Sequence, residues 1–113
     1  MDERRSEGEG LSDGPIPAHD PAGAQDVAAV VCSYGWDCAE ALAVAWCESR
    51  HDPGAIDPTR ENFGLMQINE ATWRPYFGEE RWSRVLEPEE NVKMAFTIYQ
   101  RAGNTWQPWS CRP

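Results

Sequence analysis

The longest apolar stretch of the chain predicts a helix at the centre of the domain. Asp37, followed three residues later by Glu40, has the form of a capping box, in which the Asp side chain accepts from a free backbone N–H of the first turn. Residues 38–50 are mostly strong helix formers, and the Asp-Pro-Gly run at 52–54 ends the helix. Because residues 41–47 contain no polar side chain, the helix should expose apolar surface on every side. We therefore expect it to be buried centrally.

Shorter elements should surround this helix. Helical spacing and capping residues predict further helices at residues 24–33, at a short segment opened by Asn69 and interrupted near Pro75, and at residues 87–103. The apolar face of the last helix should pack on the central helix. Residues 52–68 are rich in turn formers and predict a loop with a small β-like excursion, whereas residues 78–84 predict a solvated loop. The expected fold class is all-α, or α+β at most.

Composition limits the domain count and the possible partners. A chain of 113 residues with 41% apolar side chains is long enough for one compact domain, which we place at residues 24–113. Residues 1–23 are rich in Gly, Pro and acids and predict a disordered acidic arm. That arm lacks the apolar core of a signal peptide, and no stretch is long enough to span a membrane. The net charge of −9 argues against a nucleic-acid partner. Nothing calls for more than a monomer.

Four cysteines allow three disulfide pairings. A Cys38–Cys47 bond is excluded, because nine residues of helix separate these sulfurs by about 13 Å. Of the two pairings that remain, we favour Cys32–Cys38 with Cys47–Cys111, since the second bond would fix the C-terminal tail as a wall beside Glu48. Such disulfides imply an oxidising compartment.

The aromatic residues and the possible metal ligands give weaker indications of function. Six tryptophans invite a sugar-binding interpretation, because sugar rings stack on aromatic side chains. We expect Trp46 to pack in the core and leave Trp73, Trp82 and Trp106 open. Cys47 and His51 lie four residues apart, but the chain has no Cys-x-x-Cys pair and no His-Glu-x-x-His motif. We therefore expect neither a metal nor another cofactor.

Glu48 is the carboxylate whose surroundings matter most. It lies one helical turn beyond Val44, so its neighbours on the helix are apolar or small. Partial burial against such neighbours would raise its pKa and suit it to work as a general acid. A lone Glu near the end of a helix is more often a solvated surface residue, and spacing alone leaves both interpretations open.

Several motifs in order resemble one known group. Cys-Glu-Ser at residues 47–49, Asn-Phe-Gly-Leu-Met-Gln-Ile-Asn at 62–69, and a later helix with Asn91 and Tyr99 resemble the lysozyme-like superfamily. The match, over roughly residues 26–111, is closest to the soluble lytic transglycosylase and goose-type lysozyme group. The resemblance implies a lysozyme-like helical domain, with Glu48 as the general acid that protonates a glycosidic oxygen. It also implies substrate contacts from Ser49, Gly64, Leu65, Met66, Gln67, Asn91 and Tyr99.

The expected activity is cleavage of the β-1,4 bond between N-acetylmuramic acid and N-acetylglucosamine in peptidoglycan glycan strands. The chain departs from the resemblance in lacking an Ala-Tyr-Asn-Ala-Gly segment and in having Asn69 where goose-type enzymes usually have Asp. Hydrolysis needs a second carboxylate, for which Asp57 and Glu61 are candidates. Formation of a 1,6-anhydro product does not need one, and both outcomes stay open. A non-catalytic wall-binding module and a chitin-directed enzyme are alternatives, and a secreted enzyme or a phage endolysin would fit.

Overall fold

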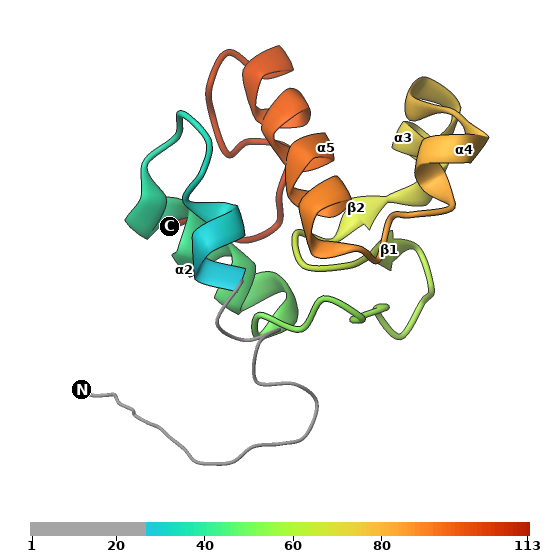
Figure 1. Cartoon of the computed structure of the whole chain (residues 1–113), viewed down its shortest axis with the longest axis horizontal. Helices are drawn as coiled ribbons and strands as arrows, with labels where there is room; N and C mark the ends of the chain where they lie inside the picture. The colour runs from blue at the N-terminus through green and yellow to red at the C-terminus, as the bar shows by residue number, and fades with distance from the viewer. Residues whose placement is uncertain (1–26) are drawn as a thin grey trace.

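The computed structural model describes residues 27–113 and consists of helices with one small hairpin. The predicted 1–23 arm and the predicted start of the first helix lie outside the described residues. The elements are a helical segment at 27–31, α2 (Cys38–Ser49), β1 (Asn62–Phe63), β2 (Ile68–Asn69), α3 (Glu70–Phe77), α4 (Glu79–Trp82) and α5 (Pro88–Arg101). The expected class, largely helical with a β-like excursion after residue 52, is confirmed. Figure 1 shows α5 between α2 on one side and the hairpin with α3 and α4 on the other.

Helix α2 begins and ends as its sequence predicts. The Asp37 side chain accepts from the Glu40 backbone N–H at 2.9 Å. At the other end Arg50 adopts a left-handed conformation, with φ of 57°, and its N–H donates to the Trp46 carbonyl. This left-handed residue ends the helix before the Asp-Pro-Gly run. Among the described helices, none is long and apolar enough to cross a membrane.

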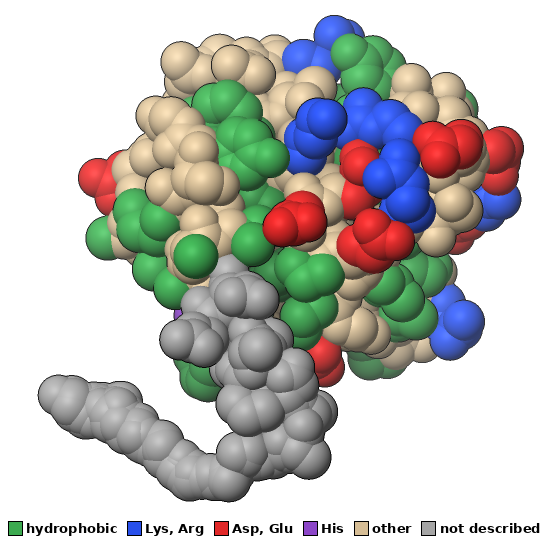
Figure 2. All heavy atoms as spheres, in the orientation of Figure 1, with side chains coloured by type: hydrophobic (Ala, Val, Ile, Leu, Met, Phe, Trp, Pro, Cys, Tyr) green, Lys and Arg blue, Asp and Glu red, His purple; other side chains and the backbone are tan. Residues whose placement is uncertain are grey.

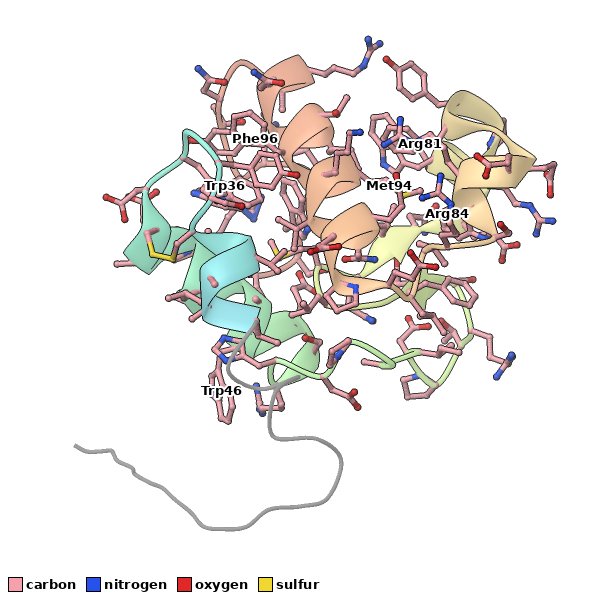
Figure 3. All side chains as sticks on the ribbon, in the orientation of Figure 1. Trp36, Trp46, Arg81, Arg84, Met94 and Phe96 are labelled. Carbon is pink, nitrogen blue, oxygen red and sulfur yellow. A yellow bond between two sulfur atoms is a disulfide. The ribbon has the colours of Figure 1, made fainter. Side chains whose placement is uncertain are left out.

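The prediction that α2 is buried on every side is wrong. Only Ala41, Val44, Ala45 and Ser49 of this helix are buried, and Trp46 is 53% exposed. Figure 3 shows Trp46 pointing away from the body of the domain. A domain of this size does not cover both sides of a helix, and alanines on the outer side leave little apolar surface in water. The indole of Trp46 instead packs beside the Arg50 guanidinium, 5.3 Å from the ring centroid.

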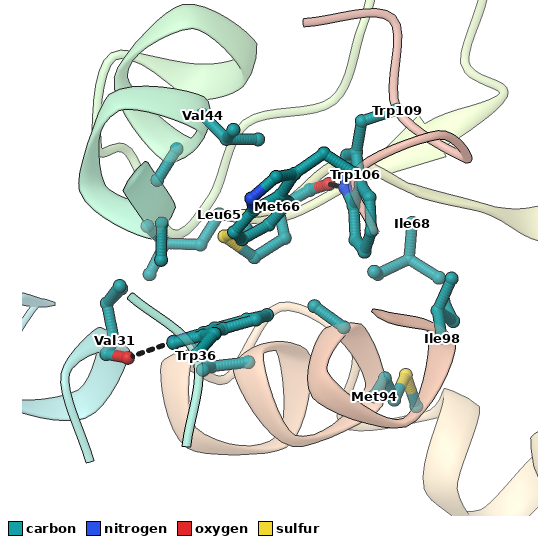
Figure 4. Packing of buried hydrophobic residues seen from close by; sticks show 14 of the residues in the cluster. Val31, Trp36, Val44, Leu65, Met66, Ile68, Met94, Ile98, Trp106 and Trp109 are labelled. Atoms are coloured by element: carbon teal, nitrogen blue, oxygen red, sulfur yellow. Dashed lines mark hydrogen bonds between the residues drawn. The ribbon is translucent and has the colours of Figure 1, made fainter. Parts of the chain in front are cut away.

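The core is a layer of side chains that separates α2 from α5. Leu65, Met66 and Trp106 occupy the space between them, as Figure 4 shows, so the expected direct packing of α5 on α2 is corrected. Trp36 lies on the α5 side of this layer, and its indole N–H donates to the Val31 carbonyl at 2.7 Å. The layer comes from the hairpin turn and the C-terminal tail, so residues distant in sequence build the core together.

Both favoured disulfides are present and confirm the predicted pairing. Cys32 and Cys38 join the helical segment at 27–31 to the start of α2, with a Cα–Cα distance of 4.9 Å. Cys47 and Cys111 join the last turn of α2 to the tail, with a Cα–Cα distance of 6.1 Å. The C-terminus accordingly lies beside α2 in Figure 1.

The predicted loop at residues 78–84 is also corrected, because it contains the one-turn helix α4. Arg81 and Arg84 from this region bind Glu90 of α5, at 2.8 Å from Nε to Oε2 and 3.1 Å from Nη1 to Oε1. Glu90 is only 7% exposed, so these charges are not simply solvated. Figure 2 shows basic and acidic side chains gathered over this part of the surface, and Figure 3 shows both arginines between α4 and α5.

Removing the Glu90 carboxylate should therefore destabilise the domain. We expect Glu90→Ala to lower the free energy of unfolding by about 3 kcal/mol, because two partly buried guanidinium groups lose their shared partner. Urea denaturation measures the change. Glu80→Ala is the matched control, since Glu80 binds Arg84 at 83% side-chain exposure and should cost less than about 1 kcal/mol. Equal losses in the two variants would show that burial of the Glu90 ion pairs is unimportant.

Candidate functional site

A narrow cavity of about 70 Å³ lies where the end of α2, the hairpin, α3 and the tail meet. Its lining comprises Glu48, Asn62, Gln67, Ile68, Asn69, Trp73, Ile98, Pro108, Trp109 and Ser110. The volume is well below the roughly 300 Å³ at which small-molecule pockets begin. A cavity of this volume has room for only part of a small-molecule ligand.

Glu48 reaches this cavity from the last turn of α2. Its Oε2 accepts from the Cys111 backbone N–H at 3.1 Å. Burial raises the pKa of the Glu48 carboxyl above its usual value of 4.5, and backbone hydrogen bonds from Cys111 and Ser110 oppose the rise without cancelling it. A carboxyl with a raised pKa keeps its proton at higher pH, so it can act as an acid where an ordinary Glu is ionised.

The raised pKa also has a consequence for stability. Between the unfolded and folded pKa of Glu48 the folded state binds more protons, so the free energy of unfolding should fall as pH rises through this interval. Glu48→Gln keeps an oxygen that accepts from Cys111 but carries no charge. We therefore expect this variant to unfold at a higher temperature than the parent at pH 7, with a smaller difference at pH 4. A variant less stable than the parent at pH 7 would contradict the assigned direction of the pKa shift.

The tail that touches Glu48 is held at three points, one of which is a hydrogen bond from Trp106 Nε1 to Glu40 Oε1 at 2.9 Å. The Cys47–Cys111 disulfide anchors it to the residue next to Glu48. The Trp109 indole N–H donates to the Met66 carbonyl at 2.8 Å, which fixes the tail to the turn of the hairpin. The tail thus forms one wall of the cavity, as the cysteine pairing predicts.

Removing this disulfide should affect both stability and activity. The bond closes a sequence separation of 64 residues, so we expect Cys47→Ser/Cys111→Ser to lose about 4 kcal/mol of unfolding free energy. The matched control Cys32→Ser/Cys38→Ser opens a separation of six residues and should lose about 2 kcal/mol. Only the Cys47–Cys111 bond positions the wall beside Glu48. Its removal should therefore also lower kcat, at temperatures where both variants are folded. Equal kcat values would mean that the tail does not position Glu48.

Hydrogen bonds from the buried side chain of Asn91 fix the hairpin that brings Gln67 and Asn69 into the cavity. Asn91 is fully buried, and its Oδ1 accepts from the Met66 N–H at 2.7 Å. Its Nδ2 donates to the carbonyls of Phe63 at 3.0 Å and Val85 at 2.8 Å. One side chain therefore satisfies three buried backbone groups on two segments.

Several residues expected to contact substrate do not reach the cavity. Of the predicted set, Glu48 and Gln67 line it, whereas Ser49, Gly64, Leu65, Met66, Asn91 and Tyr99 do not. Leu65 and Met66 are fully buried core residues, and the Ser49 hydroxyl donates to the Ala45 carbonyl inside α2. The ring of Tyr99 packs 4.8 Å from that of Trp106, centroid to centroid. These six residues lie outside the cavity lining, and their contact with substrate stays a prediction.

Neither candidate for a second carboxylate lies with Glu48. Asp57 accepts hydrogen bonds from the Thr59 hydroxyl, from the backbone of Glu61 and from both nitrogens of Asn62, at 2.8 to 3.1 Å. These bonds, above all the one from the Asn62 side chain, lower the pKa of Asp57 to about 2. Asp57 thus stabilises the conformation of its own loop. Glu61 is exposed and lines a different pocket.

Asn62 and Asn69 are the first and last residues of the 62–69 motif, were not among the expected contact residues, and pair across the hairpin. The Asn69 Nδ2 donates to the Asn62 Oδ1 at 3.2 Å, and the Asn69 Oδ1 accepts from Thr72 N at the start of α3. The placement of an Asn just before Phe63 and another just after Ile68 is the sequence signal for this pair, once a hairpin is assumed. Trp73, left open above, lines the cavity, whereas Trp82 and Trp106 are buried.

Comparison with known families agrees with the fold and the motifs. A family model described as a lysozyme-like domain matches residues 25–111. The chain belongs to this lysozyme-like family. No curated protein and no solved structure shows a significant match. Within residues 27–113, the lysozyme-like domain has no cluster of three or more His, Cys, Asp or Glu side chains that could hold a metal ion. The family points to a glycosidase that acts on peptidoglycan in the cell wall.

Proposed function

We propose that this lysozyme-like domain cleaves the β-1,4 bond between N-acetylmuramic acid and N-acetylglucosamine, with Glu48 as the general acid. The observation that carries this proposal is a half-buried carboxyl of raised pKa in a cavity lined by amides and indoles. Amide groups of Asn62, Gln67 and Asn69 suit the hydroxyl and acetamido groups of such sugars. The Trp73 ring offers an apolar surface to the face of a sugar ring.

In the proposed reaction protonated Glu48 gives its proton to the bridging glycosidic oxygen as the bond from that oxygen to C1 of the muramic acid breaks. Positive charge then develops at C1 and must be quenched by a nucleophile. The 6-hydroxyl of the same sugar can attack C1 and pass its proton to the Glu48 carboxylate. Glu48 thus donates one proton and receives one back, so its protonated form is restored. The product carries a 1,6-anhydro ring.

We propose this intramolecular route over hydrolysis. Glu48 is the only acidic side chain among the described residues that line the cavity. Hydrolysis by paired carboxylates needs a second one about 5 to 9.5 Å away, as base or nucleophile. Neither Asp57 nor Glu61 lines the cavity, and the oxygens of Asp57 already accept hydrogen bonds from its own loop. Attack by a hydroxyl of the substrate needs no second carboxylate, because Glu48 serves as acid and then as base.

Digestion of purified peptidoglycan tests the proposal. Mass spectrometry of the soluble products should show muropeptides lighter by one water than the reducing forms. Reducing ends would indicate a lysozyme instead. Binding of the parent to peptidoglycan without any release would indicate a non-catalytic wall-binding module, and cleavage of chitin oligomers but not of peptidoglycan would indicate a chitin-directed enzyme.

We further propose that the domain works as a monomer outside a reducing cytoplasm. All four cysteines are paired in disulfides, which persist in oxidising surroundings. Secretion and phage delivery would both place the domain at the cell wall. Size-exclusion chromatography with light scattering tests the monomer, and a single species of about twice the 12.7 kDa chain mass would contradict it.

A further inference from the structure

A larger pocket shares Asn69 with the Glu48 cavity. Its volume is about 600 Å³, within the roughly 300 to 1,000 Å³ range of small-molecule sites. Asn69 lines both this pocket and the Glu48 cavity, so the two are neighbours along one surface. Ala71 and Pro75 of α3 contribute apolar surface, and charged side chains of both signs surround it.

The charges of this pocket divide into a paired set and an open set. Arg74 binds Glu70 through Nη1 at 2.6 Å and Glu79 through Nε at 3.0 and 2.9 Å, so this cation and these two anions are paired with one another, with one negative charge in excess. Arg60 and Glu61, from the loop before β1, are exposed, and within residues 27–113 neither takes part in an ion pair with another side chain. The pocket thus offers one cation and one anion, adjacent in sequence, to a ligand.

We propose that this pocket binds the stem peptide of peptidoglycan, with Arg60 pairing with a peptide carboxylate and Glu61 with a peptide ammonium group. This inference rests on the proposed function of the Glu48 cavity. The stem peptide branches from the muramic acid, so a glycan strand bound at the cavity carries a peptide beside it. That peptide bears carboxylates and, where its third residue is a diamino acid, an amino group. An anionic wall polymer fits less well, because it offers no ammonium group to Glu61.

Binding can be measured without any cleavage. The Glu48→Gln variant, labelled with nitrogen-15, is titrated with a free tetrapeptide that contains a diamino acid at its third position. We expect chemical-shift changes to concentrate in the backbone amides of residues 60–61 and 69–74. Arg60→Ala/Glu61→Gln in the same background should weaken binding about five-fold, which is the range of two solvent-exposed ion pairs. Absence of shifts, or shifts outside this pocket, would overturn the proposal.

The matched control is Lys93→Ala/Glu89→Gln, which removes one exposed cation and one exposed anion away from the pocket. It should bind the tetrapeptide as the parent background does. If the control weakened tetrapeptide binding equally, the effect would come from overall charge, and the proposed peptide site would be wrong.

Cleavage rates give a second readout. The parent and Arg60→Ala/Glu61→Gln are compared on glycan strands with their stem peptides and on strands stripped of them by an amidase. We expect the ratio of the two kcat/KM values, peptide-bearing over stripped, to fall about five-fold in the variant. An unchanged ratio would overturn the peptide pocket while leaving the glycosidase intact. If the parent cleaves neither substrate, the proposed function fails, and the titration still decides whether the pocket binds peptide.

Discussion

Replacement of Glu48 by Gln should lower kcat for peptidoglycan cleavage by about 10² to 10⁴-fold, the usual contribution of a positioned general acid. The amide cannot donate an acidic proton to the leaving oxygen or take one back from the attacking hydroxyl. Gln keeps the shape of Glu and an oxygen that can accept from the Cys111 N–H. Substrate binding should therefore change little. Clearing of a peptidoglycan suspension measures the rate, and co-sedimentation with insoluble peptidoglycan measures the binding.

The control for this experiment is Glu89→Gln, since Glu89 is exposed in the first turn of α5 and does not line the cavity. It removes the same charge and should keep activity close to that of the parent. If Glu48→Gln retained more than about a tenth of the parent rate, proton transfer by Glu48 would not limit the reaction. If both variants lost activity together, net charge rather than Glu48 chemistry would be the cause.

Gly64→Ala should cause a large loss of stability. Gly64 has φ of +85°, a conformation that costs other residues about 1 to 2 kcal/mol. A Cβ there would overlap Asn91 Nδ2 and lie 2.8 Å from Asn91 Cγ and 3.0 Å from the Val85 carbonyl oxygen. Asn91 would have to move away from buried backbone groups that it satisfies. We expect about 4 kcal/mol less unfolding free energy, and a melting temperature lower by about 15 °C.

Gly103→Ala separates the two causes. Gly103 also has a positive φ, of 74°, but nothing lies within 4 Å of the position a Cβ would take. This variant should lose only about 1 to 2 kcal/mol, from backbone conformation alone. Calorimetry of the two variants gives the comparison. Similar losses at the two positions would mean that the close approach of Asn91 to Gly64 is not what requires glycine.

Local chemistry explains the parts of the fold that the sequence predicted. The Asp37 cap and the left-handed residue after α2 depend on a few adjacent residues, so the helix bounds could be derived from them. The length of the central helix excluded one of the three disulfide pairings, because the rise per residue rules out a Cys38–Cys47 bond, and the choice between the other two rested on the expected place of the tail. The hairpin and the helix after residue 87 follow from turn formers and from apolar spacing in the same way.

Contacts between distant segments explain the failures. The exposure of Trp46 depends on which side of α2 the rest of the chain covers, and its apolar neighbours in sequence carry no such information. Helix α4 carries Arg81, which binds the buried Glu90, and this pairing joins residues nine apart that the charge pattern alone assigns to solvent. The local pattern of apolar and charged residues in the sequence predicts neither the exposure of Trp46 nor the Arg81–Glu90 pair.

The candidate site was predictable at Glu48 and less so around it. The motif at 64–67 is distinctive, yet Leu65 and Met66 are buried core and Asn91 is a buried scaffold residue, whereas Gln67 reaches the cavity. A motif does not show which of its residues line a cavity and which are buried behind it. The walls contributed by Asn62, Trp73 and Ser110 come from three separate segments, which only the folded chain brings together.

The central claim is that the Glu48 cavity breaks the glycan strand of peptidoglycan by an internal displacement. The most direct test is mass spectrometry of the products that the parent protein releases from peptidoglycan in oxygen-18 water. We predict soluble muropeptides that are one water lighter than the reducing forms and carry no oxygen-18 at the new end. Reducing products that contain oxygen-18 would contradict the internal displacement, and release of no product would contradict the glycosidase itself.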